Sequence, residues 1–223
     1  MFQVKICGLT QASDAEVAIA AGADAIGLNF VPASPRCLSL ATAAELTATI
    51  DRRAQRVGVF VNQPAADILA IVRKVSLDVV QLHGDEPPEA ILEFGSLPVV
   101  RAFRGMQQFS QAIREFLDRC DALGRLPDAV LIDAYQPGSY GGTGQRVDWQ
   151  RVPDLRAVLR GVPLVLAGGL TAENVAEAIR IARPDAVDTA SGVENSPGVK
   201  DHELVRAFCA KAFRSFSQTG QNL

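Results

Sequence analysis

The sequence contains few of the residues on which metal binding, disulfide bonding and Schiff-base chemistry depend. Its 223 residues include four cysteines, two histidines and four lysines. The cysteines lie tens of residues apart and form no C-x-x-C pair, which fits neither a disulfide framework nor a zinc site. Two histidines are too few to indicate a transition-metal site. We therefore expect no metal and a reducing, cytoplasmic location.

Long apolar runs and an excess of positive charge are also missing. No apolar run is long enough to span a bilayer, and the first residues carry a lysine but no small-residue cleavage site, so we expect neither a membrane partner nor secretion. The 22 Lys and Arg residues are outnumbered by 25 Asp and Glu residues, for a net charge of -3. Neutralising a nucleic-acid backbone needs concentrated positive charge, so no nucleic-acid partner is expected. No G-x-G-x-x-G fingerprint opens a helix after a strand, and we expect no cofactor.

The sequence does contain eight short apolar runs, rich in Gly, Ala, Val and Leu. Continuous apolar runs are typical of parallel strands that are buried on both faces. The predicted strands are 2–6, 25–30, 57–61, 79–82, 99–103, 129–132, 163–167 and 186–189.

A stretch with helical spacing follows each run. The first is predicted to begin at an S-x-x-E capping signature, Ser13 to Glu16, and to end before Gly22. Thr171 is a candidate N-cap for the seventh, accepting a hydrogen bond from an amide near Asn174. The other predicted helices are 42–52, 65–74, 88–94, 109–122, 149–159, 172–182 and 202–213.

Eight strand–helix units in 223 residues average about 28 residues each, close to the minimum for a βαβ unit with short loops. An open doubly wound sheet could be built from such units, but eight equal repeats are more economically closed into a (β/α)₈ TIM barrel. We predict an α/β fold with a single barrel domain over residues 1–214 and a frayed polar tail over residues 215–223.

The active site of such a barrel lies at the C-terminal ends of the strands, so polar residues just after each run become candidates. These are Lys5 and Cys7, Ser34-Pro35-Arg36, Asn62, Gln81 and His83, Arg101 and Arg104, Asp133, Gly168-Gly169, and Asp188 with Ser191-Gly192.

Cys7 and Asp133 are the candidate proton-transfer groups. Cys7 precedes Gly8, which would let a ligand approach the sulfur, so it could act as a base or nucleophile; alternatively it is a small buried hydrophobe. Lys5 could favour the thiolate, whereas burial would oppose it. Asp133 emerges from an apolar strand, a setting that can raise a carboxyl pKa as a general acid needs; alternatively it caps the following loop.

Glycine-rich loops near the sixth, seventh and eighth strands predict a phosphate site. They offer unhindered backbone amides, and the loops after strands seven and eight are the usual seat of phosphate in these barrels. A single such loop would be weak evidence, but two stand at adjacent strand ends. The loops contain Gly141-Gly142-Thr143-Gly144, Leu166-Ala167-Gly168-Gly169-Leu170 and Thr189-Ala190-Ser191-Gly192.

Arg36 and His83 have two interpretations each. The planar fork of Arg36 could hold a carboxylate in two bonds, or the residue could simply lie at the surface. His83 could contact substrate or be a satisfied core imidazole. Only Lys5 of the four lysines stands at a strand end, which leaves little room for a Schiff-base enzyme that needs a second amine. What remains is cofactor-free acid–base chemistry on a phosphorylated, carboxylate-bearing small molecule.

Six motifs, in order along the chain, resemble those of the phosphoribosylanthranilate isomerase family. The opening K-x-C-G-x-T and the Q-L-H-G motif are the most specific, and Pro197-Gly198-x-Lys200-Asp201 extends the match. The motifs are Lys5-Ile6-Cys7-Gly8-Leu9-Thr10, Ser34-Pro35-Arg36, Gln81-Leu82-His83-Gly84, Gly141-Gly142-Thr143-Gly144, Leu166-Ala167-Gly168-Gly169-Leu170 and Ser191-Gly192-Val193-Glu194. The resemblance implies an isomerase of tryptophan biosynthesis that converts N-(5-phosphoribosyl)anthranilate into its 1-deoxyribulose 5-phosphate isomer by an Amadori rearrangement.

The resemblance also implies residue roles. Asp133 would be the general acid that opens the ribose ring, Cys7 the base that removes the C2' proton, and Arg36 the group that grips the anthranilate carboxylate. The phosphate would be held by Gly168, Gly169, Ser191 and Gly192. Our predicted substrate-binding set is completed by Lys5, Gln81, His83, Gly142 and Asp188.

Two positions depart from the family pattern. Asn29 stands where an apolar or variable residue is usual, and Ala190 where Ser is common. The sister barrels of the tryptophan and histidine pathways, and a non-catalytic barrel that binds a sugar phosphate, remain alternatives. The sequence leaves both a monomer and a homodimer open.

Overall fold

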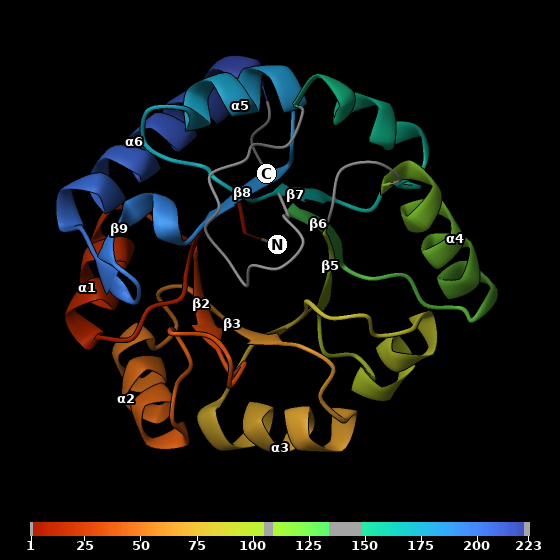
Figure 1. Ribbon diagram of the computed structural model, residues 1–223, viewed down its shortest axis with the longest axis horizontal. Helices are drawn as coiled ribbons and strands as arrows, with labels where there is room; N and C mark the ends of the chain where they lie inside the picture. Colours follow the sequence, from red (N-terminus) through yellow and green to blue (C-terminus); the bar gives the residue numbers. More distant parts are fainter. Residues whose placement is uncertain (1, 105–108, 134–148, 221–223) are drawn as a thin grey trace.

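Eight parallel strands form a closed barrel, with helices surrounding it in a ring (Figure 1). The computed structural model describes residues 2–104, 109–133 and 149–220. Each strand pairs with the next along the chain, and β1 pairs with β8 to close the ring, which confirms the predicted TIM barrel. The strands are β1 (Val4–Cys7), β2 (Ala25–Asn29), β3 (Gln55–Phe60), β4 (Val79–Leu82), β5 (Val99–Arg104), β6 (Ala129–Asp133), β7 (Leu164–Leu166) and β8 (Ala186–Thr189). A hairpin of β9 (Glu194–Ser196) and β10 (Val199–Lys200) follows β8.

The helical segments are α-helices and shorter 3₁₀ helices, written η. Two predicted helices are 3₁₀ segments: 88–94 begins with Pro88 at its first position, and 149–159 is split because Pro153 has no amide to continue the ladder. No helix of the described part is both long and apolar enough to cross a bilayer. The helical segments are α1 (Ala12–Ala20), α2 (Leu40–Ile50), α3 (Ala65–Val75), η1 (Pro88–Phe94), α4 (Phe109–Ala122), η2 (Trp149–Arg151), η3 (Pro153–Ala157), α5 (Val175–Ala182), η4 (Ser191–Val193) and α6 (His202–Thr219).

Both predicted N-caps differ from the structure. Helix α1 begins at Ala12, so Ser13 lies inside its first turn; Asp14 there accepts hydrogen bonds from the amide of Lys200 and pairs with His202, so a tertiary contact sets the position of this end. The hydroxyl of Thr171 accepts a bond from the amide of Glu173 at 3.2 Å, one turn before α5 begins.

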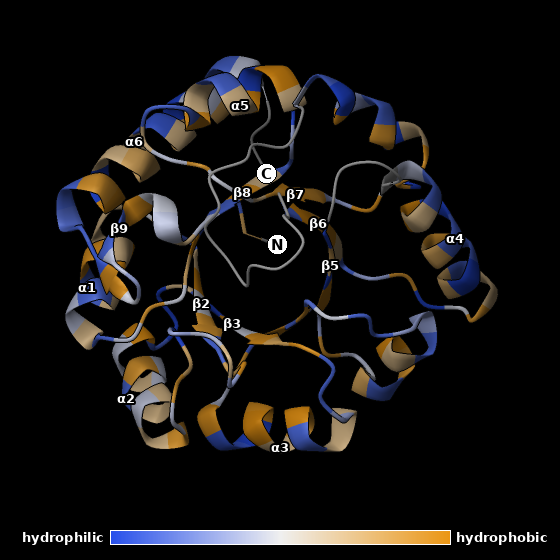
Figure 2. Ribbon diagram, in the orientation of Figure 1, coloured by the Kyte–Doolittle hydropathy of each residue, from blue (hydrophilic) through white to orange (hydrophobic). Residues whose placement is uncertain are grey.

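Two apolar clusters stabilise the barrel, one between strands and helices and one inside the ring. Strand residues alternate between them: Val130 and Ile132 of β6 face the helices, whereas Ala129 and Leu131 point inward. Figure 2 accordingly shows mostly hydrophobic strands and helices that carry both hydrophobic and hydrophilic residues. The interior cluster contains Phe2, Ala25, Val57, Val79, Val100, Ala102, Ala129, Leu131, Val165, Ala167 and Ala186.

The predicted polar tail from residue 215 is wrong over its first five residues, because α6 continues to Thr219. Ser215 and Phe216 are buried, and the hydroxyl of Ser215 bonds back to the carbonyl of Lys211 at 2.8 Å. Because the residues around Phe216 are polar, the sequence pattern predicted that the helix ends at residue 213, before this last apolar contact.

We predict that Phe216→Ala lowers the free energy of unfolding by about 3–5 kcal/mol, since a fully buried phenyl ring leaves a cavity. Urea unfolding followed by circular dichroism measures the change. The matched control is Gln218→Ala, at an exposed position of the same helix. Equal stability of the two variants would mean that this end of α6 contributes nothing to the core.

Candidate active site

The inward-facing side chains at the C-terminal ends of the strands are polar, in contrast to the apolar interior below them. Lys5 of β1 is in register with Ala25 of the interior cluster, and Gln81 of β4 with Val100. Asp133 follows Leu131 by two residues and therefore shares its inward direction. By the same alternation the inward set is Lys5, Cys7, Gln81, His83, Asp133 and Asp188.

These residues form two groups on opposite sides of the barrel mouth. Cys7, Lys5 and Asp188 come from the adjacent strands β1 and β8, whereas Gln81, His83 and Asp133 come from β4 and β6. In a ring of eight, β1 and β6 are three positions apart. The candidate base and the candidate acid therefore face each other across the mouth.

The thiol of Cys7 occupies space that a glycine leaves open. A Cβ atom at Gly27, its register partner on β2, would lie 2.5 Å from the sulfur. Burial raises the pKa of the Cys7 thiol, and the neighbouring ammonium of Lys5 opposes that rise without cancelling it. The thiol of the unliganded protein is thus mostly protonated, and its thiolate is a strong base when it forms.

Lys5 is fully buried and forms an ion pair with Asp188, whose Oδ2 lies 2.7 Å from Nζ. Burial opposes its charge, but Asp188 and Cys7 outweigh burial and raise the pKa of Lys5. Lys5 lies beneath Cys7, and its contact with the substrate stays a prediction. Asp188 Oδ1 is buried and has no hydrogen-bond partner among the described residues.

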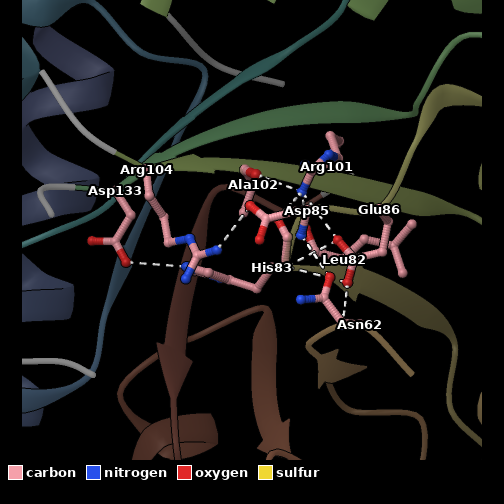
Figure 3. A network of polar contacts seen from close by, with 10 residues as sticks. Asn62, Leu82, His83, Asp85, Glu86, Arg101, Ala102, Arg104 and Asp133 are labelled. Atoms are coloured by element: carbon pink, nitrogen blue, oxygen red, sulfur yellow. Dashed lines mark hydrogen bonds and ion pairs between the residues drawn. The ribbon is translucent and has the colours of Figure 1, made fainter. Parts of the chain in front are cut away.

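On the other side, an amide–imidazole–carboxylate chain links three inward residues. Gln81 Nε2 lies 2.9 Å from His83 Nδ1. His83 Nε2 in turn lies 3.2 Å from Asp133 Oδ2 (Figure 3). With the Gln81 amide donating to Nδ1, the ring proton is on Nε2 and points at the carboxylate. Gln81 is buried, so it supports His83 from below; His83 and Asp133 retain exposed surface at the mouth.

The loop after β4 is held by a buried ion pair outside the ring. Arg101 alternates with the interior residues of β5 and points outward, where it bonds to the carbonyl of Gly84 at 3.0 Å and to Glu86 at 3.2 Å (Figure 3). Glu86 accepts hydrogen bonds from the amides of Gly84 and Asn62. Arg101 and Asn62, both strand-end candidates, therefore fix the backbone beside His83 and do not line the site.

Arg36 is not an isolated surface arginine. Its Nε and Nη2 donate to the two carboxylate oxygens of Glu194 at 2.8 and 2.5 Å. Lys200 Nζ reaches the same carboxylate at 2.7 Å. Glu194 and Lys200 are not among the predicted site residues, because both lie beyond the end of β8 on the hairpin. Asn29, the unusual residue of β2, accepts a bond from the amide of Val31 and so shapes the loop that carries Arg36.

The predicted phosphate loops after β7 and β8 touch each other. Gly168 and Gly169 have φ values of +85° and +66°, which a side chain would disfavour. A Cβ at Gly192 would lie 1.8 Å from the carbonyl oxygen of Leu170, so only glycine permits this approach. Ser191 is exposed beside it. Gly142 and its loop lie outside the described residues.

The comparisons with known proteins agree with one another. The family model "N-(5'phosphoribosyl)anthranilate (PRA) isomerase" matches residues 4–211. An N-(5'-phosphoribosyl)anthranilate isomerase of Acidithiobacillus ferrooxidans is 48% identical over 95% of this chain and 97% of its own length. The solved isomerase of Thermotoga maritima covers 96% of this chain and 100% of its own, with 37% identity and a TM-score of 0.82. Another similar structure, 35% identical with a TM-score of 0.78 and covering 96% of this chain and 100% of its own, contains reduced 1-(o-carboxyphenylamino)-1-deoxyribulose 5-phosphate.

We predict that alkylation of Cys7 by iodoacetamide rises with pH with a midpoint above 9.0, the ordinary value from which burial raises the pKa of this thiol. A Cys37→Ser background removes the exposed cysteine, and the pKa values of buried Cys120 and Cys209 are about 11 and about 12. Peptide mass spectrometry reports the modified site.

In the same experiment Lys5→Met moves the midpoint further up, because it removes the charge that opposes the rise. Lys74→Met, at an exposed position of α3, leaves it unchanged. A midpoint below 9.0, or a downward shift in Lys5→Met, contradicts the electrostatic description of this thiol.

Proposed function

The chain belongs to the N-(5'-phosphoribosyl)anthranilate isomerase family, and from this premise we propose how its residues divide the reaction. It is an enzyme of tryptophan biosynthesis and carries out the isomerisation of N-(5-phosphoribosyl)anthranilate. The substrate has a phosphate at one end, an aryl carboxylate at the other, and the ribose that reacts between them.

Holding both ends places the ribose over the barrel mouth. The backbone amides of Gly168, Gly169 and Gly192, with Ser191, bind the phosphate at the β7 and β8 loops, as the close approach of these loops supports. Arg36 binds the carboxylate. Asp188 Oδ1, which lacks a partner among the described residues, accepts a hydrogen bond from a ribose hydroxyl.

Asp133 opens the ribose ring. In its protonated form it donates a proton to the ring oxygen as the C1'–O bond breaks, which leaves a protonated imine between C1' and the anthranilate nitrogen. The His83 Nε2, 3.2 Å from Asp133 Oδ2, orients the carboxyl group and then stabilises the carboxylate that remains after proton transfer. Gln81 keeps the imidazole in the orientation that this requires.

Cys7 completes the reaction from the opposite side. Its thiolate removes the C2' proton, and the electron pair of that C–H bond forms the C1'=C2' bond as the imine nitrogen becomes an amine. The positive charge of the imine favours the thiolate at this step, together with Lys5. The resulting enolamine tautomerises to the ketose product.

The observation that carries this proposal is the placement of Cys7 and the His83-paired Asp133 on facing sides of one mouth. The family relationship supports a cytoplasmic enzyme acting on a phosphorylated small molecule. A similar structure, 34% identical with a TM-score of 0.81, is of monomers generated from the dimeric isomerase of T. maritima. For this chain a monomer and a homodimer both accommodate the site, because every residue used above comes from one chain.

We predict that Cys7→Ala and Asp133→Asn each lower kcat about 10²- to 10⁴-fold with KM largely unchanged, the effect of losing a general base or acid. The assay follows the loss of anthranilate-type fluorescence after addition of freshly made substrate. Cys37→Ala and Asp118→Asn, both on the surface, are the matched controls and stay at wild-type rates. Near-normal turnover of Asp133→Asn would mean that another acid opens the ring, and no turnover by the wild-type protein would contradict the isomerase assignment itself.

Arg36→Ala is expected to act on binding. Loss of a charged hydrogen-bond pair raises KM about 10- to 100-fold, while kcat changes little because the reacting atoms lie elsewhere. Arg53→Ala removes an exposed arginine that pairs with Glu16 and serves as the control. A defect confined to kcat would contradict the carboxylate role.

A further inference from the structure

We propose that Glu194 and Lys200 are positioning residues that make Arg36 selective for the carboxylate of the substrate: Glu194 fixes the guanidinium plane, and Lys200 restores the positive charge that Glu194 removes. This inference rests on the proposed role of Arg36. The three residues are called the Arg36 triad below.

The geometry of the Arg36 triad leaves one edge of the guanidinium for a ligand. Glu194 occupies Nε and one N–H of Nη2, through bonds of 2.8 and 2.5 Å. Nη1 makes no hydrogen bond among the described residues, and Nη2 has a second N–H on the same side. This second edge is the fork that binds a carboxylate in two parallel bonds.

The side chain of Arg36 is also confined from below. A Cβ atom at Gly8, the residue after Cys7, would lie 2.4 Å from Arg36 Cδ, so the aliphatic part of Arg36 packs directly on this backbone. Its own amide donates to the Ser34 hydroxyl at 3.1 Å. With Glu194 at the far end, both ends of the side chain are held, and little rotational freedom remains to be lost when a ligand binds.

Glu194 is itself held in the β9–β10 hairpin. It accepts a bond from the amide of Gly198, whose carbonyl accepts one from Thr10. Lys200 reaches Glu194 at 2.7 Å and the carbonyl of Ala190 at 3.0 Å, so the hairpin joins the Arg36 triad to the loop after β8. The carboxylate and phosphate subsites therefore share one support.

The charges explain why two cations surround one carboxylate. An Arg36–Glu194 pair alone is neutral and would attract a substrate carboxylate weakly. Lys200, whose side chain is fully buried, brings the triad to a net charge of +1. Burial opposes the ionisation of Glu194, yet bonds from Arg36 and Lys200 outweigh it and lower its pKa.

The same electrostatics make Glu194→Gln a test of orientation. Burial lowers the pKa of Lys200, and Glu194 is the strongest group that opposes this. Without the carboxylate Lys200 loses its proton more easily, so Glu194→Gln adds at most one unit of positive charge to the triad. A gain in charge would strengthen carboxylate binding, so a loss of selectivity in this variant reports the freed guanidinium plane.

The test compares two ligands in each variant by calorimetric titration. One ligand is reduced 1-(o-carboxyphenylamino)-1-deoxyribulose 5-phosphate. The other is the same compound without the carboxylate, so that a phenylamino group replaces the carboxyphenylamino group. The dissociation constant of the phenylamino compound, divided by that of the carboxyphenylamino analogue, measures how much the carboxylate contributes to binding. Because both ligands are titrated into the same sample, any loss of folded protein affects them alike.

We expect Glu194→Gln to reduce this ratio about tenfold, with the affinity for the phenylamino compound unchanged. Lys200→Met is a second, independent variant and reduces the ratio by lowering the net charge. Glu203→Gln, which alters an exposed glutamate paired with Arg206 on α6, leaves the ratio at its wild-type value. Arg36→Ala abolishes carboxylate selectivity altogether.

Three results overturn the inference. If Arg36→Ala loses selectivity but Glu194→Gln retains or increases it, the positioning role fails while the role of Arg36 stands. If Glu194→Gln weakens both ligands equally, its role is only structural. If Arg36→Ala keeps full selectivity, the proposed carboxylate site fails first and the inference falls with it.

Discussion

The pairing of β1 with β8 is the contact on which the fold and the site both depend. It closes the ring, and in the same register it sets Lys5 beside Asp188, so a fully buried ammonium meets a carboxylate at 2.7 Å. Neither charge is tolerable alone, since removing one partner of a buried ion pair costs about 3–5 kcal/mol. The closure of the barrel thus determines the electrostatic setting of Cys7, two residues from Lys5 on the same strand. Cys7, the proposed base, therefore lies on the strand whose pairing with β8 completes the barrel.

The remaining polar groups are arranged as separate, locally compensated clusters. Lys5 with Asp188 lies beneath Cys7, the proposed base; Gln81 and His83 hold Asp133, the proposed acid; and the Arg36 triad lies at the proposed carboxylate end. Each cluster pairs its buried charges within itself, so substrate binding need not break one to satisfy another. Preorganised groups of this kind stabilise charge in the transition state without reorganising.

The fold was predictable because its signals are local. Apolar runs such as 79–82 and 186–189 coincide with β4 and β8, and the place of Asp133 directly after the run 129–132 was sufficient to put it at the C-terminal end of β6. Contacts between distant segments were not predictable. The start of α1 depends on Asp14 meeting His202, and the partners of Arg36 lie more than 150 residues away on the hairpin. Selecting the polar residues directly after each strand does not find Glu194. This residue lies beyond the end of β8, on the hairpin that brings its carboxylate to Arg36.

In the proposed reaction, Asp133 opens the ring and Cys7 then removes the C2' proton. The direct measurement is the isotope effect on kcat/KM with substrate deuterated at C2', compared between Cys7→Ser and Asp133→Asn. Weakening the base makes proton removal limiting, so Cys7→Ser should show a full primary isotope effect. Weakening the acid makes ring opening limiting, so Asp133→Asn should show none. Equal effects in the two variants, or the reverse order, would contradict this division of the reaction.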